Sequence, residues 1–195
     1  MATTSDLRVG SVINHNGDLC VVLESQHRTP GNLRAFYQVK MRVIKTGKLK
    51  EERFRSGETI EFVRIETNNF QYLYQDGDVY MFMDTNNYEQ IPVPAELIGD
   101  GSKWMKEGME VQIGRDEEGS IITLELPPNV PLSITHTEPG LKGDTATNAL
   151  KPATVETGAQ VMVPLFINEG DTVRVDTSSG AYLDPFSQVQ AYFSG

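Results

Sequence analysis

The sequence is poor in the residues that build disulfides, metal sites and membrane spans. Cys20 is its only cysteine, so neither an internal disulfide nor a multi-cysteine metal site can form. Its three histidines are far apart in sequence and lack ligand partners at metal spacing. The apolar run at residues 161–167 is much shorter than the roughly 18 residues of a membrane-spanning helix. We therefore expect no metal, no cofactor and no membrane association.

Signals for secretion and for catalysis are also missing. The first residues, Met1–Asp6, have neither the basic start nor the apolar stretch of a secretion signal, so we expect a cytoplasmic protein. Cys20 lies in the apolar run Leu19–Leu23, which favours a buried strand thiol over a nucleophile. Paired acids lie beside turns, where solvated surface is the usual explanation. No catalytic constellation emerges, and the chain is not expected to be an enzyme.

Positive charge is scarce overall but is concentrated at the start of the chain. The net charge is −10. Up to Ile65 there are 11 Lys and Arg against 7 Asp and Glu, and beyond it there are 6 against 20. The first third is therefore basic, at +4, while the rest carries −14. If the partner is a nucleic acid, the first third should make most of the phosphate contacts.

What the sequence does have is a regular series of turn signals between short strand-like runs. Asn16-Gly17, Asp76-Gly77 and Glu169-Gly170 are examples. The runs between such turns are rich in Val, Ile, Tyr, Phe and Thr, which predicts an all-β protein made of hairpins. Each third of the chain is expected to contain one hairpin. In the first third, Tyr37–Val43 is expected to be a half-buried strand. Residues 72–74 are expected to pair with 79–82 in the second third, and residues 166–167 with 172–173 in the last.

The best helical candidates are single turns at residues 95–98 and 103–106, separated by Gly99-Asp100-Gly101. Two features divide the chain. Pro127-Pro128 cannot continue a central strand and makes a natural hinge, and the charge changes sign near Ile65. We therefore expect three units at 1–65, 66–127 and 128–195, each at the small end of what folds alone.

A basic loop lies between two predicted strands of the first unit. It occupies residues 26–34, and Pro30-Gly31 at its tip has the residue types of the two central positions of a type II turn. Arg28 and Arg34 bracket this tip, while Lys40 and Arg42 extend the basic face along the next strand, where they could contact RNA backbone. The residues alone slightly favour an ordinary exposed hairpin, because such loops are common.

Ordered motifs along the chain add to this interpretation. The first third has Pro30-Gly31, Ala35-Phe36, Val39-Lys40, Arg42 and Thr46-Gly47; the second has Tyr72-Leu73-Tyr74, Asp76-Gly77 and Ile98-Gly99-Asp100; the third has residues 138–146, 151–154, 156–158, 163–167 and 170–171. Through these motifs the chain, from about Asp6 to Tyr182, resembles the bacterial elongation factor P family. Motifs in the same order across three units are far more specific than any one of them.

The resemblance implies three small β-barrels in an L-shaped, tRNA-like arrangement, the first SH3-like (KOW-like) and the others of OB type. It implies a monomer that binds both ribosomal subunits beside peptidyl-tRNA and promotes peptide bond formation at consecutive prolines. Its action would be positioning of the tRNA acceptor end. The loop that the resemblance assigns to the peptidyl-transferase centre contains Arg28, Thr29, Pro30, Gly31, Asn32, Leu33 and Arg34.

The sequence departs from the family pattern at Asn32, because relatives usually have a lysine or arginine there that is enzymatically extended. A carboxamide offers no amine to acylate and carries no permanent charge. Three interpretations stay open. The loop works unmodified through a rigid turn, Arg34 or Arg28 supplies the charge, or this chain has diverged in its task. We favour the first, because a pre-ordered tip loses less entropy on binding.

The resemblance also assigns a loop of the third unit to the mRNA codon in the ribosomal exit site. Gly143, Asp144 and Thr145 match the family there, whereas Asn148, Ala149 and Leu150 replace glycines and restrict the backbone. From the residues alone, a capping loop that contacts nothing would be favoured. The alternative for the whole chain is an OB-type module that binds single-stranded nucleic acid or a protein away from the ribosome.

Overall fold

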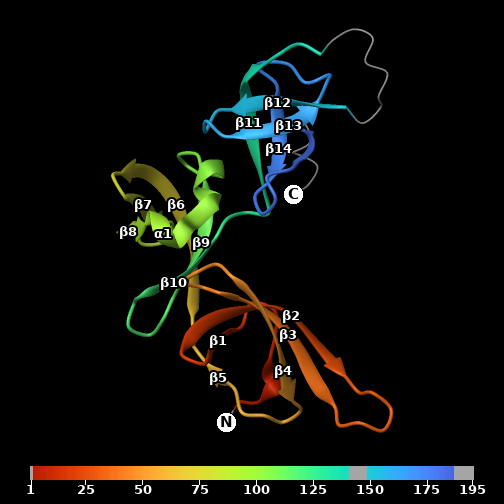
Figure 1. The fold of residues 1–195 in the computed structure, drawn as a ribbon. Helices are drawn as coiled ribbons and strands as arrows, with labels where there is room; N and C mark the ends of the chain where they lie inside the picture. The colour runs from red at the N-terminus through yellow and green to blue at the C-terminus, as the bar shows by residue number, and fades with distance from the viewer. Residues whose placement is uncertain (1, 141–148, 187–195) are drawn as a thin grey trace. The chain divides into compact units, whose positions relative to one another are not determined.

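The computed structural model describes residues 2–140 and 149–186, which form an almost entirely β-stranded protein. The strands make three curled sheets of five strands each (Figure 1). This confirms the predicted fold class, an all-β chain with three small barrel-type units. No helix in these residues is long and apolar enough to cross a membrane.

The first sheet has the strand order β4-β3-β2-β1-β5. Its strands are β1 (Val12–His15), β2 (Asp18–Arg28), β3 (Phe36–Val43), β4 (Leu49–Arg55) and β5 (Glu61–Phe62), preceded by a 3-10 helix, η1 (Thr4–Asp6). The predicted alternation in β3 is confirmed, because Val39, Met41 and Val43 are buried while Lys40 and Arg42 are exposed. Buried side chains of β1 to β4 pack into one core under the sheet.

The second sheet has the order β10-β9-β6-β7-β8. Its strands are β6 (Glu66–Asp76), β7 (Val79–Asp84), β8 (Gln90–Pro94), β9 (Glu110–Arg115) and β10 (Ile121–Glu125). The predicted hairpin at Asp76-Gly77 is confirmed, with Asp76 opposite Val79. Gly77 has a φ of 58°, and a tight hairpin turn of this kind requires a positive φ at a central position.

Two short helices follow β8, and one of them differs from the prediction. Helix α1 (Ala95–Ile98) is where it was expected, but the 3-10 helix η2 (Gly99–Trp104) begins at Gly99 and includes the glycines that were expected to separate two turns. Gly99 has a φ of 63° and lies directly after Ile98. Its left-handed backbone ends α1, and the chain then continues into η2 without a loop.

The third sheet has the order β13-β12-β11-β14-β15. Its strands are β11 (Asn129–Thr137), β12 (Leu150–Val155), β13 (Gln160–Pro164), β14 (Thr172–Asp176) and β15 (Tyr182–Pro185). The hairpin predicted between residues 166–167 and 172–173 is wrong. Strand β13 ends at Pro164, and β14 pairs with β11 and β15 instead. The turn that precedes β14 is hydrogen-bonded to β11, because the Ile134 amide donates to the Asp171 carbonyl at 2.8 Å.

Contacts divide the chain into two compact units. The first contains residues up to Asn68 together with Ile113–Leu124, and the second contains Asn69–Gln112 and the residues from Glu125 onward. In the first unit, Ile122 of β10 packs against Val12 and Val21 of the first sheet. The second sheet therefore contributes strands to both units, and the hairpin of β9 and β10 adds apolar surface to the first unit.

Within the second unit, η2 contacts the third sheet. The Thr157 hydroxyl donates to the Lys103 carbonyl at 2.5 Å, and Lys106 Nζ lies 3.4 Å from Glu156 Oε1. A Cβ atom added at Gly180 would lie 2.8 Å from Cζ2 of Trp104, closer than such atoms normally approach. The lack of a side chain at Gly180 therefore allows the Trp104 ring to pack there.

We expect Gly180→Ala to destabilise the second unit more than Gly170→Ala does. Both glycines have positive φ, 75° and 87°, but a Cβ at Gly170 would meet nothing within 4 Å. The control should lose about 1–2 kcal/mol through backbone strain, and Gly180→Ala about 1–3 kcal/mol more through overpacking. Urea unfolding followed by the fluorescence of Trp104, the only tryptophan, measures both. Equal losses would contradict the packing argument.

A second expectation concerns acid stability of the β14–β15 pair. Arg174 Nε donates to Asp184 Oδ1 at 2.6 Å, and this hydrogen bond holds the pKa of Asp184 below its usual range. A carboxyl with a lowered folded pKa stabilises the fold above its unfolded pKa, about 3.9, and this contribution is lost as the pH falls through the folded value. Unfolding midpoints of wild type and Asp184→Asn should therefore differ at pH 7 and converge below about pH 4.

The matched control for this pair is Glu89→Gln. Glu89 is an exposed carboxylate of the same unit whose side chain has no hydrogen-bond partner in the described residues. Its substitution should leave the midpoint close to wild type at every pH. A constant difference between wild type and Asp184→Asn across the acid range would contradict the role of the Arg174 pair.

Candidate nucleic-acid interface

The loop singled out in the sequence lies at the far end of the β2–β3 hairpin (Figure 1). Strand β2 ends at Arg28 and β3 begins at Phe36, and these two residues are paired. Next to this last pair, the His27 and Tyr37 rings stack with centroids 4.6 Å apart. Tyr37 in turn packs against the core under the first sheet. The end of the arm is therefore connected to the core by a stack of rings.

The turn at the tip differs from the prediction. The Leu33 amide donates to the Pro30 carbonyl at 2.9 Å, which makes Gly31 and Asn32 the two central residues. Neither has a positive φ, whereas a type II turn needs one at its second central position. The predicted type II turn centred on Pro30-Gly31 is therefore wrong. Pro30 is the first residue of the turn, and the conformational freedom of Gly31 is not used.

The tip is exposed and positively charged. Arg28, Thr29, Gly31, Asn32, Leu33 and Arg34 are exposed and Pro30 is half-buried; Leu33 retains 74% of its accessible surface. Arg28 Nη2 donates to Gln26 Oε1 at 2.9 Å. Arg34 has no hydrogen bond or ion pair within the described residues. Its guanidinium is thus available to a partner at the very end of the arm.

Lys40 and Arg42 lie on the outer face of the same sheet but away from the tip. Lys40 is opposite Glu24 of β2 and Glu51 of β4. At about 3.3 Å per residue, Lys40 is roughly 13 Å along the strand from Phe36. Arg42 lies between Val21 and Leu49. The predicted basic face is therefore interrupted by acidic neighbours at Lys40.

Strand pairing brings two further arginines to the tip end, which the sequence analysis did not single out. Arg55 is opposite Phe36, and Arg53 is opposite Gln38 with its guanidinium 5.0 Å from the Phe36 ring centroid. The alternation Arg53-Phe54-Arg55 could have indicated that both arginines face outward, because Phe54 belongs in a core. Only the register of β3 and β4 places them beside the tip.

The second unit uses its basic residues differently. Each of the four basic residues described there is engaged: Lys103 lies over the Trp104 ring, Lys106 pairs with Glu156, Lys151 donates to the Glu138 carbonyl, and Arg174 pairs with Asp184. By contrast, no ion pair among the described residues includes Arg28, Arg34, Arg53 or Arg55. The tip end of the first sheet thus gathers four arginines without an ion pair among the described residues.

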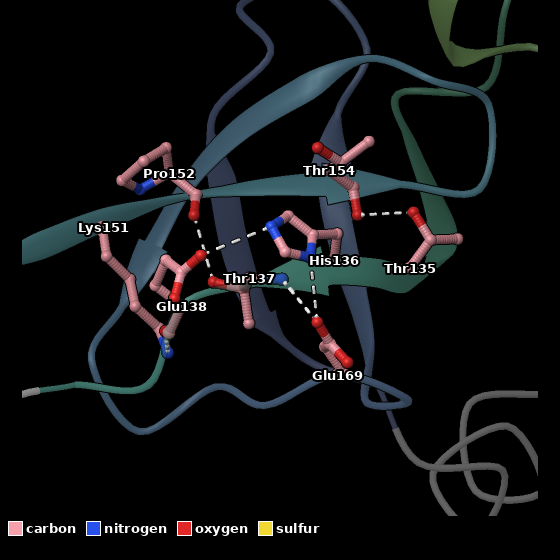
Figure 2. Close-up of polar contacts among 8 residues, drawn as sticks. All are labelled: Thr135, His136, Thr137, Glu138, Lys151, Pro152, Thr154 and Glu169. Carbon is pink, nitrogen blue, oxygen red and sulfur yellow. Dashed lines mark hydrogen bonds and ion pairs between the residues drawn. The ribbon is translucent and has the colours of Figure 1, made fainter.

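The residues predicted to contact the exit-site codon, Gly143, Asp144 and Thr145, lie outside the described residues. The strands before and after them are described. Figure 2 shows a polar network that joins the end of β11 to the start of β12. The Thr137 hydroxyl donates to the Pro152 carbonyl at 3.0 Å, and the buried Lys151 donates to the Glu138 carbonyl at 2.6 Å. These bonds hold the end of β11 and the start of β12 together.

A histidine also belongs to this network. His136 Nδ1 lies 3.0 Å from Glu169 Oε1, and its Nε2 lies 3.6 Å from Glu138 Oε1 (Figure 2). The Thr137 amide also donates to Glu169 Oε1, at 3.3 Å. Glu169 belongs to the turn before β14, so the network holds that turn against β11 as well.

The described residues include no group of three His, Cys, Asp or Glu side chains that could hold a metal ion. Cys20 is fully buried, and burial raises the pKa of its thiol, which keeps it protonated and unreactive. What the tip arm offers chemically is exposed guanidinium groups, which are hydrogen-bond donors suited to anionic oxygens.

Family models match all three parts of the chain. Residues 3–60 match the family model "Elongation factor P (EF-P) KOW-like domain", residues 65–123 match "Elongation factor P (EF-P) OB domain", and residues 130–184 match "Elongation factor P, C-terminal". These descriptions agree with the KOW-like barrel predicted for residues 1–65 and the OB-type barrel predicted for residues 66–127.

Curated relatives match over nearly their whole length. Elongation factor P of Chloroflexus aggregans is 52% identical over 93% of this chain and 96% of its own, and that of Chloroherpeton thalassium is 48% identical over 94% and 98%. A solved structure, eukaryotic translation initiation factor 5A from Methanococcus jannaschii, is 24% identical with a TM-score of 0.47, covering 63% of this chain and 92% of its own. By its domain matches and relatives, the chain belongs to the elongation factor P family of translation elongation factors.

Proposed function

We propose that this translation elongation factor binds the ribosome next to peptidyl-tRNA and promotes peptide bond formation where consecutive prolines stall synthesis. The observation that carries the proposal is the exposed, unpaired positive charge at the end of the β2–β3 arm, in a chain that belongs to this family. An arm of this kind can reach RNA that is out of reach of a compact domain surface. The protein acts in the cytoplasm, as a monomer and without a cofactor.

The mechanism that we propose is positioning. In this proposal the ribosome carries out the chemistry and the factor supplies no reacting group. Its contribution is to restrain the acceptor end of the peptidyl-tRNA, so that less orientational freedom is lost on the way to the transition state. A correctly oriented reactant can gain several kcal/mol in this way, far more than a single surface contact supplies.

Within the tip we assign separate roles to the turn and to the charge. The Pro30–Leu33 turn is closed by its own hydrogen bond, so part of the ordering cost is met before binding. Asn32, at the centre of the turn, offers amide donors and acceptors but no charge. The charge comes from Arg34, which has no partner among the described residues, and from Arg28, which Gln26 orients. The loop works without modification.

In the last third of the chain, we propose that Gly143, Asp144 and Thr145 contact the mRNA codon in the exit site. The support is the network around Thr137 and Lys151, which holds both strands that lead to these residues. Together, this contact and the contact of the tip loop would engage both ribosomal subunits.

We expect Arg34→Gln to slow peptide bond formation at a Pro-Pro-Pro stall by about 10- to 100-fold, the equivalent of one charged hydrogen bond of about 1.5–3 kcal/mol. Arg34→Lys should retain part of the activity, because it keeps the charge but not the planar fork. Lys45→Gln is the matched control, since Lys45 is an exposed cation of the same sheet at the β3–β4 turn. The measurement is single-turnover formation of the proline peptide on stalled ribosomes.

Wild-type protein that leaves these stalls unchanged and never co-migrates with ribosomes would favour the alternative, an OB-type module that acts elsewhere. Equal slowing by Arg34→Gln and Lys45→Gln would instead show a general charge effect and contradict the role of the tip.

We also expect the tip to carry no added mass in native cells. Asn32 has no amine to acylate, and the proposal needs no longer side chain. Peptide mapping over Gln26–Lys40, together with the intact mass of the chain, makes the measurement. Added mass on Arg28 or Arg34 would replace the unmodified tip with a modified arginine.

A further inference from the structure

A shallow hollow lies where β4 ends. Arg53, Arg55, Ser56, Gly57 and Glu58 line it. The two arginines are on the outer face of the strand, separated by the buried Phe54, and both are exposed. The Ser56 hydroxyl has no hydrogen-bond partner within the described residues. The hollow thus offers two guanidinium groups and one free hydroxyl, which are donors suited to phosphate oxygens.

The acidic residue of the hollow is engaged elsewhere. Glu58 Oε2 accepts a hydrogen bond from the Arg55 amide at 2.9 Å, which directs this carboxylate toward the backbone of β4. No ion pair of 4.0 Å or less joins Glu58 to Arg53 or Arg55 among the described residues. The arginine side chains therefore stay available despite a carboxylate nearby.

Packing against an aromatic ring holds one of the two arginines in place. The Arg53 guanidinium lies 5.0 Å from the centroid of the Phe36 ring, the distance of a cation–π contact. Phe36 is half-buried and is the first residue of β3, directly after the tip loop. A ring that supports one face of the guanidinium leaves its edge N–H groups free to donate in a defined direction.

Charge is arranged in rows across the outer face of the sheet. The row nearest the tip joins Arg28, Phe36 and Arg55, and the next joins Gln26, Gln38 and Arg53. The third row joins Glu24, Lys40 and Glu51, with a net negative charge. A polyanion that follows the arm would meet positive charge in the first two rows and repulsion at the third.

We propose that this hollow is a second phosphate-binding site, at which Arg53, Arg55 and Ser56 hold the backbone of the same RNA that the tip loop contacts. The proposal deepens the proposed function and rests on it. The two sites would grip the RNA on either side of Phe36, and the acidic third row sets the limit of the contact. The site limits how far the arm extends along the RNA, because an RNA strand cannot move past Glu24 and Glu51 without meeting their negative charge.

The test is the salt dependence of binding. Affinity is measured by fluorescence anisotropy at several KCl concentrations, with stalled ribosomes carrying peptidyl-tRNA and, separately, with free labelled tRNA. Log affinity falls as log salt rises, and the double variant R53Q/R55Q should make this slope shallower by about 1.4–1.8. The change is about 0.7–0.9 for each phosphate that the variant no longer neutralises. The control K45Q/K48Q removes two exposed cations from the β3–β4 turn of the same sheet. Its slope should equal that of wild type.

The two probes separate failure of this inference from failure of the proposed function. Equal slopes for R53Q/R55Q and wild type, with wild type binding normally, would overturn the inference and leave the proposed function standing. Equal reductions in both double variants would also overturn it, because they would show a diffuse field instead of a site. Wild type that binds tRNA but not ribosomes would contradict the proposed function, and a reduced slope for R53Q/R55Q alone on tRNA would still support the site.

Discussion

The pairing of β3 with β2 on one side and with β4 on the other fixes where the charged strand residues of the candidate interface lie. Eight residue pairs join β2 to β3, and seven join β3 to β4. This ladder carries Arg28 and Phe36 to the end of the arm and places Arg53 and Arg55 beside them. A shift of one residue in this register would turn Arg53 and Arg55 toward the core and Phe54 toward water. The burial of Phe54 therefore protects the arrangement of charge at the tip.

Net charge is a poor guide to this protein because its basic residues do two different jobs. In the second unit they hold the structure together, as in the pair of Arg174 with Asp184 and the buried bond from Lys151. At the tip end of the first sheet they have no acidic partners among the described residues. An acidic chain with a net charge of −10 can thus present a local cationic surface. In the proposed function, the acidic remainder would repel RNA elsewhere and restrict contact to that surface.

Errors in the sequence analysis have a common physical origin. The tip turn was placed one residue early, because Pro30 and Gly31 suit a type II turn by their residue types, while the hydrogen bond from Leu33 selects Gly31 and Asn32. The third hairpin was assigned to neighbouring segments, yet β14 pairs with β11, whose residues are about forty positions away in sequence. In both cases a backbone partner decided the outcome, and local preference does not specify which partner wins.

Local patterns were enough to predict the all-β class, the alternation of β3, the hairpin at Asp76-Gly77 and the concentration of positive charge in the first third. These features depend on side-chain period, turn residues and composition, which are local properties. Three features of the site come from the fold alone: Lys40 lies between two glutamates, Arg53 packs on Phe36, and Glu58 is hydrogen-bonded to the backbone of β4. Each of these depends on the register between strands distant in sequence. That register is set by packing over the whole core, and a linear pattern does not contain it.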